Sequence, residues 1–209
     1  MDEFPGRQAA VLSFSSAGAN PQTVLSPGRM FHRSELRSMS LDGLLTPVFA
    51  DAYTVTGTAS TPAMRSHAVS LALPANLVNR AVLGRLTAAW IYGCGPAPST
   101  ISLLVDNGHR ITALRPWSGC ILHEVSLGPF DVIQFSGAAV TSPLRTAVDV
   151  ALHVPSAQAV PVLLMLSADP VLKCPLTLIR DALESGCRIP HKTRALECVR
   201  WLLNHSGRL

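Results

Sequence analysis

One stretch of twelve residues limits what this chain can fold into more than any other. It runs from Val140 to Ala151 and reads V-T-S-P-L-R-T-A-V-D-V-A. The β-branched Val140 and Thr141 favour an extended backbone. Ser142 can cap a helix, and Pro143 suits the first helical position, whose N–H group has no partner inside the helix. The stretch therefore predicts a strand that leads directly into a helix.

The start of this helix also carries the densest group of polar residues. Arg145 and Asp149 are four residues apart, so they share a helix face and can pair, with Thr146 between them. A helix N-terminus attracts anions. Arg145 could hold a phosphate by two hydrogen bonds, and Asp149 could bind Mg²⁺ or accept a hydroxyl proton. The alternative is a structural ion pair, with Thr146 bonded back to a strand carbonyl.

The hydrophobic pattern along the whole chain predicts an α+β fold. Short strands separated by Gly, Pro, Asn and Asp turns are expected at 100–105, 111–114, 120–127 and 131–141. Helices are expected at 7–14, 61–73, 85–92, 143–153, 156–167, 175–184 and 190–204. We therefore expect a degenerate N-terminal winged-helix-like segment, a small antiparallel sheet and a C-terminal helical bundle.

The N-terminal part has the outline of a winged helix. A helix over 34–39 ends near Gly43, and 48–55 is typical of a strand or hairpin. No room is left for a separate recognition helix, which a DNA reader places in the major groove, so operator DNA is a doubtful partner. We divide the chain into a winged-helix-like region over 1–73 and a second domain over 74–209, with a mixed sheet over 100–141 and helices over 143–205.

Composition narrows the class of protein further. Hydrophobic residues make up 48% and charged residues 14% of the chain, which is typical of a folded globular protein. The net charge of +4 is compatible with nucleic acid or an acidic protein as partner. Cys120 and His123 lack a second ligand pair at zinc spacing, which argues against a metal site. On its otherwise apolar strand, His123 is better interpreted as a hydrogen-bonded core histidine than as a catalytic one. The apolar run over 150–168 is interrupted by prolines, and we expect a cytoplasmic protein without membrane contact.

Two motifs resemble a known family. T-S-P-x-R-T-x-x-D over 141–149, together with L-T-A-A-W-x-x-G over 86–93, is similar to the AbiEi-type antitoxins of bacterial type IV and VII toxin–antitoxin systems. His123, in C-I-L-H-E, stands at the usual histidine position of that family. The resemblance covers about residues 35–205. The short length and the arginine-rich composition most resemble the MenA-like members, which are described as toxin-antagonising kinases.

The resemblance implies a cognate nucleotidyltransferase-fold toxin as the partner. In similar members the antitoxin neutralises this toxin by serine phosphorylation, which implies ATP or another nucleoside triphosphate with Mg²⁺. On that reading Arg145 and Asp149 are catalytic, and Asp149 also binds the metal. Thr146 and Lys192 would bind the nucleotide. For Lys192 the alternative is a solvated basic helix end. No standard kinase motif is present in the sequence, so such a kinase is atypical. The alternative function is a non-catalytic antitoxin or an autorepressor that binds toxin or operator DNA.

Overall fold

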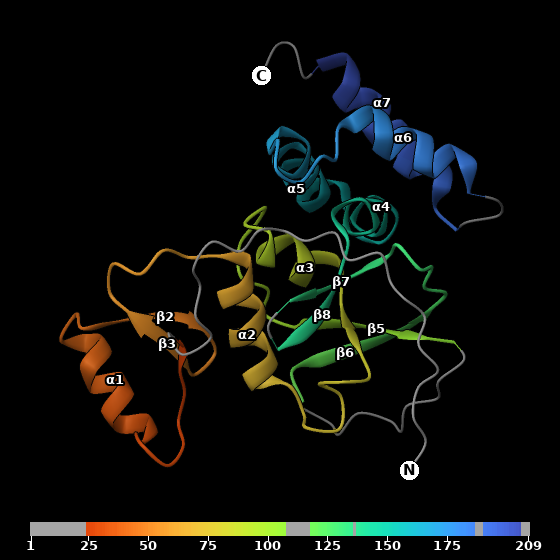
Figure 1. The fold of residues 1–209 in the computed structure, drawn as a ribbon. Helices are drawn as coiled ribbons and strands as arrows, with labels where there is room; N and C mark the ends of the chain where they lie inside the picture. Colours follow the sequence, from red (N-terminus) through yellow and green to blue (C-terminus); the bar gives the residue numbers. More distant parts are fainter. Residues whose placement is uncertain (1–23, 108–117, 136, 187–189, 206–209) are drawn as a thin grey trace.

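The computed structural model describes residues 24–107, 118–135, 137–186 and 190–205 (Figure 1). These residues form a three-stranded sheet, a five-stranded sheet and helices, so the predicted α+β class is confirmed. The helix expected at 7–14 and the strand expected at 111–114 lie outside the described residues. The helices are α1 (Arg33–Leu41), α2 (Pro62–Ala72), α3 (Arg85–Ile91), α4 (Pro143–His153), α5 (Ser156–Ala168), α6 (Leu176–Ser185) and α7 (Lys192–His205).

The N-terminal strands form a small antiparallel sheet. They are β1 (Val24–Leu25), β2 (Leu45–Phe49) and β3 (Ala52–Val55), in the order β1-β3-β2. Helix α1 connects β1 to β2 and packs on the sheet through Leu36, which forms a small buried cluster with Leu45 and Tyr53. This part of the structure matches the expected degenerate winged-helix-like segment.

The larger sheet is mixed, with the strand order β6-β5-β4-β8-β7. Strands β4 and β8 are parallel, β5 and β6 are parallel, and the remaining neighbours are antiparallel. Its strands are β4 (Val82–Leu83), β5 (Ile101–Asp106), β6 (Cys120–Val125), β7 (Val132–Phe135) and β8 (Ala138–Thr141). In the sequence, the central strand β4 precedes residue 100, where the predicted sheet (100–141) begins. With two residues it is too short to show a period-2 pattern in the sequence.

Helix α2 lies between the two sheets (Figure 1). Its N-terminus is capped by Thr61, whose hydroxyl accepts a hydrogen bond from the Met64 backbone N–H at 3.2 Å. The helix contacts β2 and β3 on one side and β7, β8 and α3 on the other. The boundary predicted between 73 and 74 thus falls directly after this connecting helix.

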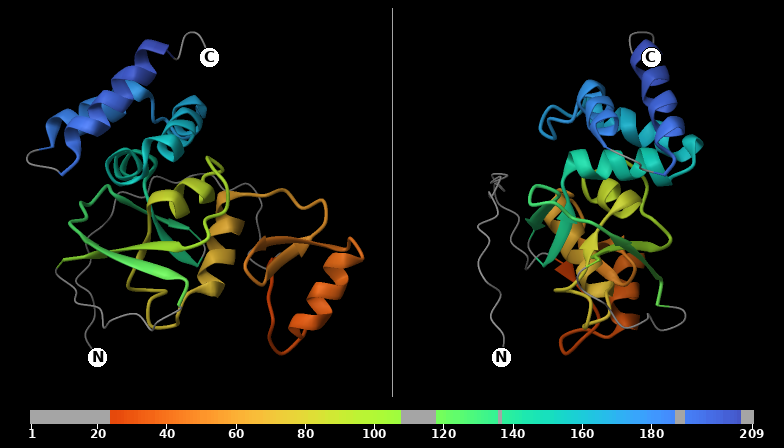
Figure 2. Two further views of the ribbon diagram at one scale, coloured as in Figure 1. Left: turned by 180° about the vertical axis from the view of Figure 1, so that it is seen from behind. Right: turned by 90° about the vertical axis from the view of Figure 1, so that its right-hand side faces the viewer.

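The C-terminal helical bundle is present as predicted. Helix α3 packs on the large sheet, α4 packs on α3, and α5, α6 and α7 pack on α4 (Figure 2). Buried leucines of α5, α6 and α7, among them Leu163, Leu183 and Leu202, continue the core of the sheet. In the described ranges no helix combines the length and the apolar character needed to cross a membrane.

Candidate functional site at the start of helix α4

The junction between β8 and α4 has the local structure that the sequence predicts. Strand β8 ends at Thr141, and Ser142 accepts a hydrogen bond from the Arg145 backbone N–H at 3.4 Å. Pro143 occupies the first turn, where the missing N–H costs nothing. Because β8 is parallel to β4, the starts of α4 and α3 lie at the same edge of the sheet.

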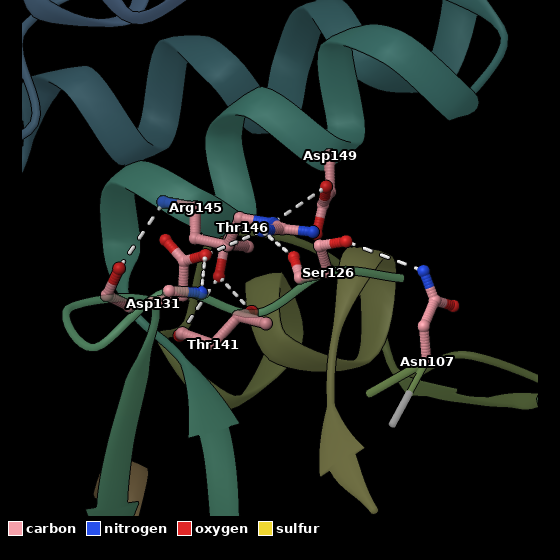
Figure 3. Close-up of polar contacts among 9 residues, drawn as sticks. Asn107, Ser126, Asp131, Thr141, Arg145, Thr146 and Asp149 are labelled. Carbon is pink, nitrogen blue, oxygen red and sulfur yellow. Dashed lines mark hydrogen bonds and ion pairs between the residues drawn. The ribbon is translucent and has the colours of Figure 1, made fainter. Parts of the chain in front are cut away.

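Arg145 connects this helix to the loop between β6 and β7 (Figure 3). Its Nε donates to both carboxylate oxygens of Asp149, at 3.1 and 3.0 Å. Its Nη1 donates to Asp131 Oδ2 at 2.6 Å and to the Ser126 carbonyl at 3.0 Å. Asp131 Oδ2 also accepts the Gly128 backbone N–H at 2.8 Å. The guanidinium therefore has two carboxylates and one carbonyl as partners.

Thr146 is fully buried and bonded to the end of β8. Its hydroxyl lies 2.7 Å from the Thr141 hydroxyl and 3.1 Å from the Thr141 carbonyl. The Tyr92 hydroxyl donates to the same carbonyl at 2.6 Å. This is the back-bonding to a strand carbonyl that the structural interpretation predicts. Because Thr146 is fully buried, its hydroxyl has no access to solvent.

Asp149 is 4% exposed, and its two oxygens face Arg145. Burial raises its pKa, while the guanidinium groups of Arg145 and Arg85 act against that rise. A Mg²⁺ ion needs accessible carboxylate oxygens, and here the ion would have to displace Arg145. In the described residues no three His, Cys, Asp or Glu side chains are grouped to hold a metal. Asp149 in this arrangement does not fit the predicted metal site.

Lys192 is separate from this network. Its ammonium donates to the carbonyls of Glu184 and Gly186, at 2.8 and 2.6 Å, and so closes the C-terminal end of α6. This position suits a lysine, because the free carbonyls of a helix end carry partial negative charge. With Thr146 buried and Lys192 bonded to α6, neither side chain in this arrangement fits a nucleotide phosphate. The assignment of Arg145, Asp149, Thr146 and Lys192 to catalysis and to ATP stays a prediction.

The structure adds Arg85, which sequence reasoning did not single out. Arg85 is the first residue of α3 and follows Gly84, where an added Cβ would lie 2.7 Å from the buried Leu104 side chain. Its Nη1 lies 3.1 Å from His123 Nε2. Because a guanidinium can only donate, Nε2 is the acceptor and the His123 ring is neutral in this contact. Burial and the charge of Arg85 both lower the pKa of His123.

Sequence reasoning missed Arg85 and Asp131 for a common reason. Asp131 and Arg85 reach the start of α4 only through the packing of the β6–β7 loop and of α3, far from Arg145 in sequence. The Asp131 position follows a Gly-Pro turn, which predicts a loop and nothing about its partner. His123 was interpreted as a hydrogen-bonded core residue, and it is a half-buried side chain bonded to Arg85.

Comparison with known proteins gives a structural likeness. No family model and no curated relative matches the chain. The chain is similar to the Rv2827c protein from Mycobacterium tuberculosis, whose crystal structure aligns with a TM-score of 0.42 and 18% sequence identity. The alignment covers 83% of this chain and 65% of that protein, so this chain spans less than two thirds of its length.

Proposed function

We propose that this chain is an antitoxin that neutralises a nucleotidyltransferase-like toxin by binding it. The single observation that carries the binding mode is Trp201 on α7, which is 49% exposed and stacks on His205 with ring centroids 4.5 Å apart. Tryptophan is enriched at the centres of protein–protein interfaces relative to the rest of the protein surface. The antitoxin assignment itself comes from the family resemblance of the 86–93 and 141–149 motifs.

Trp201 borders a groove of about 500 Å³ between α5 and α7. Its lining combines the apolar Ala157, Val160 and Cys198 with the charged Arg194 and Glu197. An apolar centre with charges around it is the usual anatomy of a protein–protein interface. A toxin helix or loop with a large apolar side chain would suit this groove.

Binding can be measured with a nucleotidyltransferase-fold toxin, for which the genes next to this one are the first place to search; a neighbourhood without such a gene would count against the antitoxin function. We expect Trp201→Ala to weaken complex formation by at least about tenfold, because interface tryptophans are typical hot spots. Phe130→Ala is the matched control, since Phe130 is 74% exposed in the β6–β7 loop, away from the groove. Equal loss in both variants, or none in either, would contradict the proposed interface. Failure of the native chain to bind that toxin would contradict the antitoxin function.

Serine phosphorylation of the toxin is the second candidate. One observation favours it: the Arg85 guanidinium has no ion pair within the described residues and lies in the electrostatic field of Asp149. Incubation with toxin, ATP and Mg²⁺, followed by intact-mass measurement, would detect an added phosphoryl group. No added mass would leave binding as the mechanism. Loss of the added mass in Asp149→Asn, with toxin binding retained, would support the catalytic assignment.

Operator binding has the weakest support. Helix α1 exposes Arg33 and Arg37, but Arg33 is paired with Asp51 at 2.8 Å and Glu35 lies on the same helix. These carboxylates reduce the positive field that phosphate contacts need. A mobility shift of the promoter that weakens steeply with salt would favour this alternative.

A further inference from the structure

Basic side chains without an acidic partner gather beside the Arg145 network. They come from α3, β6, α4 and the residue before α7, and we refer to them together as the basic face: Arg85, His123, His153 and His191. Within the described residues none of the four forms an ion pair with a carboxylate. Both nearby carboxylates, Asp131 and Asp149, are bonded to Arg145 instead.

Arg85 has the most unsatisfied side chain of this group. Its Nε is buried and has no hydrogen-bond partner among the described residues. In the same part of the chain, the side-chain hydrogen bond that Arg85 makes runs from Nη1 to His123. Its backbone φ of +52° is unfavourable for a residue with a Cβ, and such strain is retained where the surroundings fix a side chain in place. Arg85 is thus held at this position without a negative charge to bind.

The histidines continue this group along α4 and offer ring N–H groups as hydrogen-bond donors. Arg145, Asp149 and His153 are spaced at i, i+4 and i+8, so His153 lies on the helix face that begins with the ion pair. The His153 and His191 rings meet edge to face with centroids 6.5 Å apart. Burial lowers the pKa of His153 to about 4, and Arg85, His191, His123 and Arg145 all add to this effect. An anion is the chemical complement of such surroundings.

We propose that the basic face binds a phosphate group, either as inorganic phosphate or as the terminal phosphate of a small phosphorylated molecule. A guanidinium without a carboxylate partner, beside several imidazole N–H donors, matches the oxygens and the double charge of a phosphate better than a single carboxylate. The site is distinct from the α5–α7 groove. It does not depend on the toxin proposal.

Titration calorimetry of the full chain at low salt tests this site. The probes are inorganic phosphate, tripolyphosphate and ATP, without Mg²⁺. We expect at least one probe to bind, and Arg85→Gln to weaken that binding about tenfold, because a hydrogen bond to a charged group is lost. His153→Gln should weaken it severalfold, because the substitution removes the imidazole on the helix face that continues from Arg145 and Asp149. Arg180→Gln is the control, since Arg180 lies on α6 and is paired with Asp181 at 2.7 Å.

The three probes separate the sources of the phosphate. Equal affinity for all three supports a single phosphate, tighter binding of tripolyphosphate and ATP supports a phosphate chain, and tightest binding of ATP supports a nucleotide. The proposal is overturned if no probe binds at millimolar concentration, or if both site variants bind like the native chain. If Arg85→Gln does not fold, His153→Gln decides between these outcomes. Toxin binding, measured separately, stays unchanged in His153→Gln if the two sites are independent.

Discussion

Arg145 and Arg85 stand at two similar junctions of the same sheet, and their environments are opposite. Each follows a strand of the parallel β4–β8 pair and lies in the first turn of the next helix. Arg145 follows a capping serine and a proline and binds two carboxylates. Arg85 follows a glycine without a side-chain cap, has a positive φ and is bonded to a neutral histidine.

The difference indicates that the two arginines have different roles. A guanidinium bonded to a buried carboxylate stabilises the fold, because loss of the guanidinium leaves that buried charge unpaired. A guanidinium without a carboxylate stabilises little and is available for an anion. Arg145, which belongs to the T-S-P-x-R-T-x-x-D motif, therefore has the environment of a residue that stabilises the fold. Arg85, which lies outside that motif, has the environment of a residue that binds a ligand.

The largest expected effect comes from Arg145→Gln. Asp149 stays buried after this substitution and loses its ion-pair partner, so we expect a loss of about 3 kcal/mol in the free energy of unfolding near neutral pH. Urea denaturation measures this change. The loss should shrink at acidic pH, because protonation of the raised-pKa Asp149 carboxyl removes the unpaired charge. Unchanged stability would mean that the network is not structural.

Thr146→Val should have a smaller effect. The substitution keeps the volume and removes the hydroxyl that bonds Thr141 in the core, so we expect a loss of about 1–2 kcal/mol in the free energy of unfolding. Thr193→Val, at an exposed position on α7, is the control and should change stability by less than about 0.5 kcal/mol. Equal values for the two variants would show that the buried hydroxyl pair contributes nothing.

Arg85→Gln should change stability less than Arg145→Gln. Its Nε is buried without a partner, so its removal costs no carboxylate contact, and we expect a change within about 1 kcal/mol. Urea denaturation of Arg85→Gln and Arg145→Gln under the same conditions compares the loss of unfolding free energy at the two junctions. If Arg85→Gln lost as much unfolding free energy as Arg145→Gln, the two arginines would not differ in their contribution to stability.

His153→Gln should alter the dependence of stability on pH. The folded-state pKa of His153, about 4, lies below its unfolded value of about 6.5. Its neutral form therefore stabilises the fold above pH 6.5, and that contribution is lost as the pH falls from about 6.5 toward 4. The variant should lose less stability than the native chain over this range in acid unfolding. Removing Arg85 as well should reduce the difference, since Arg85 contributes to the lowered pKa.

Prediction from the sequence succeeded where a signal is local. Proline and serine at helix starts located α2 and α4, and the predicted limits of α5, α6 and α7 are within two residues of the observed ones. The two-residue β4 was missed because its pairing with β5 and β8, and not its own pattern, makes it a strand. For the candidate site the sequence predicted the Arg145–Asp149 pair but not Asp131 or Arg85, which are neighbours only in three dimensions.

The sequence by itself determined that Val140–Ala151 joins a strand to a capped helix and that Arg145 can reach Asp149, since caps and i,i+4 pairs depend on adjacent residues. Only the tertiary structure decided what these side chains do. The β6–β7 loop gives Arg145 its second carboxylate, and β8 takes the Thr146 hydroxyl. Asp149 is thereby bonded to Arg145, which leaves the Arg85 guanidinium, beside the neutral His123, without an ion pair to any acidic residue of the described structure.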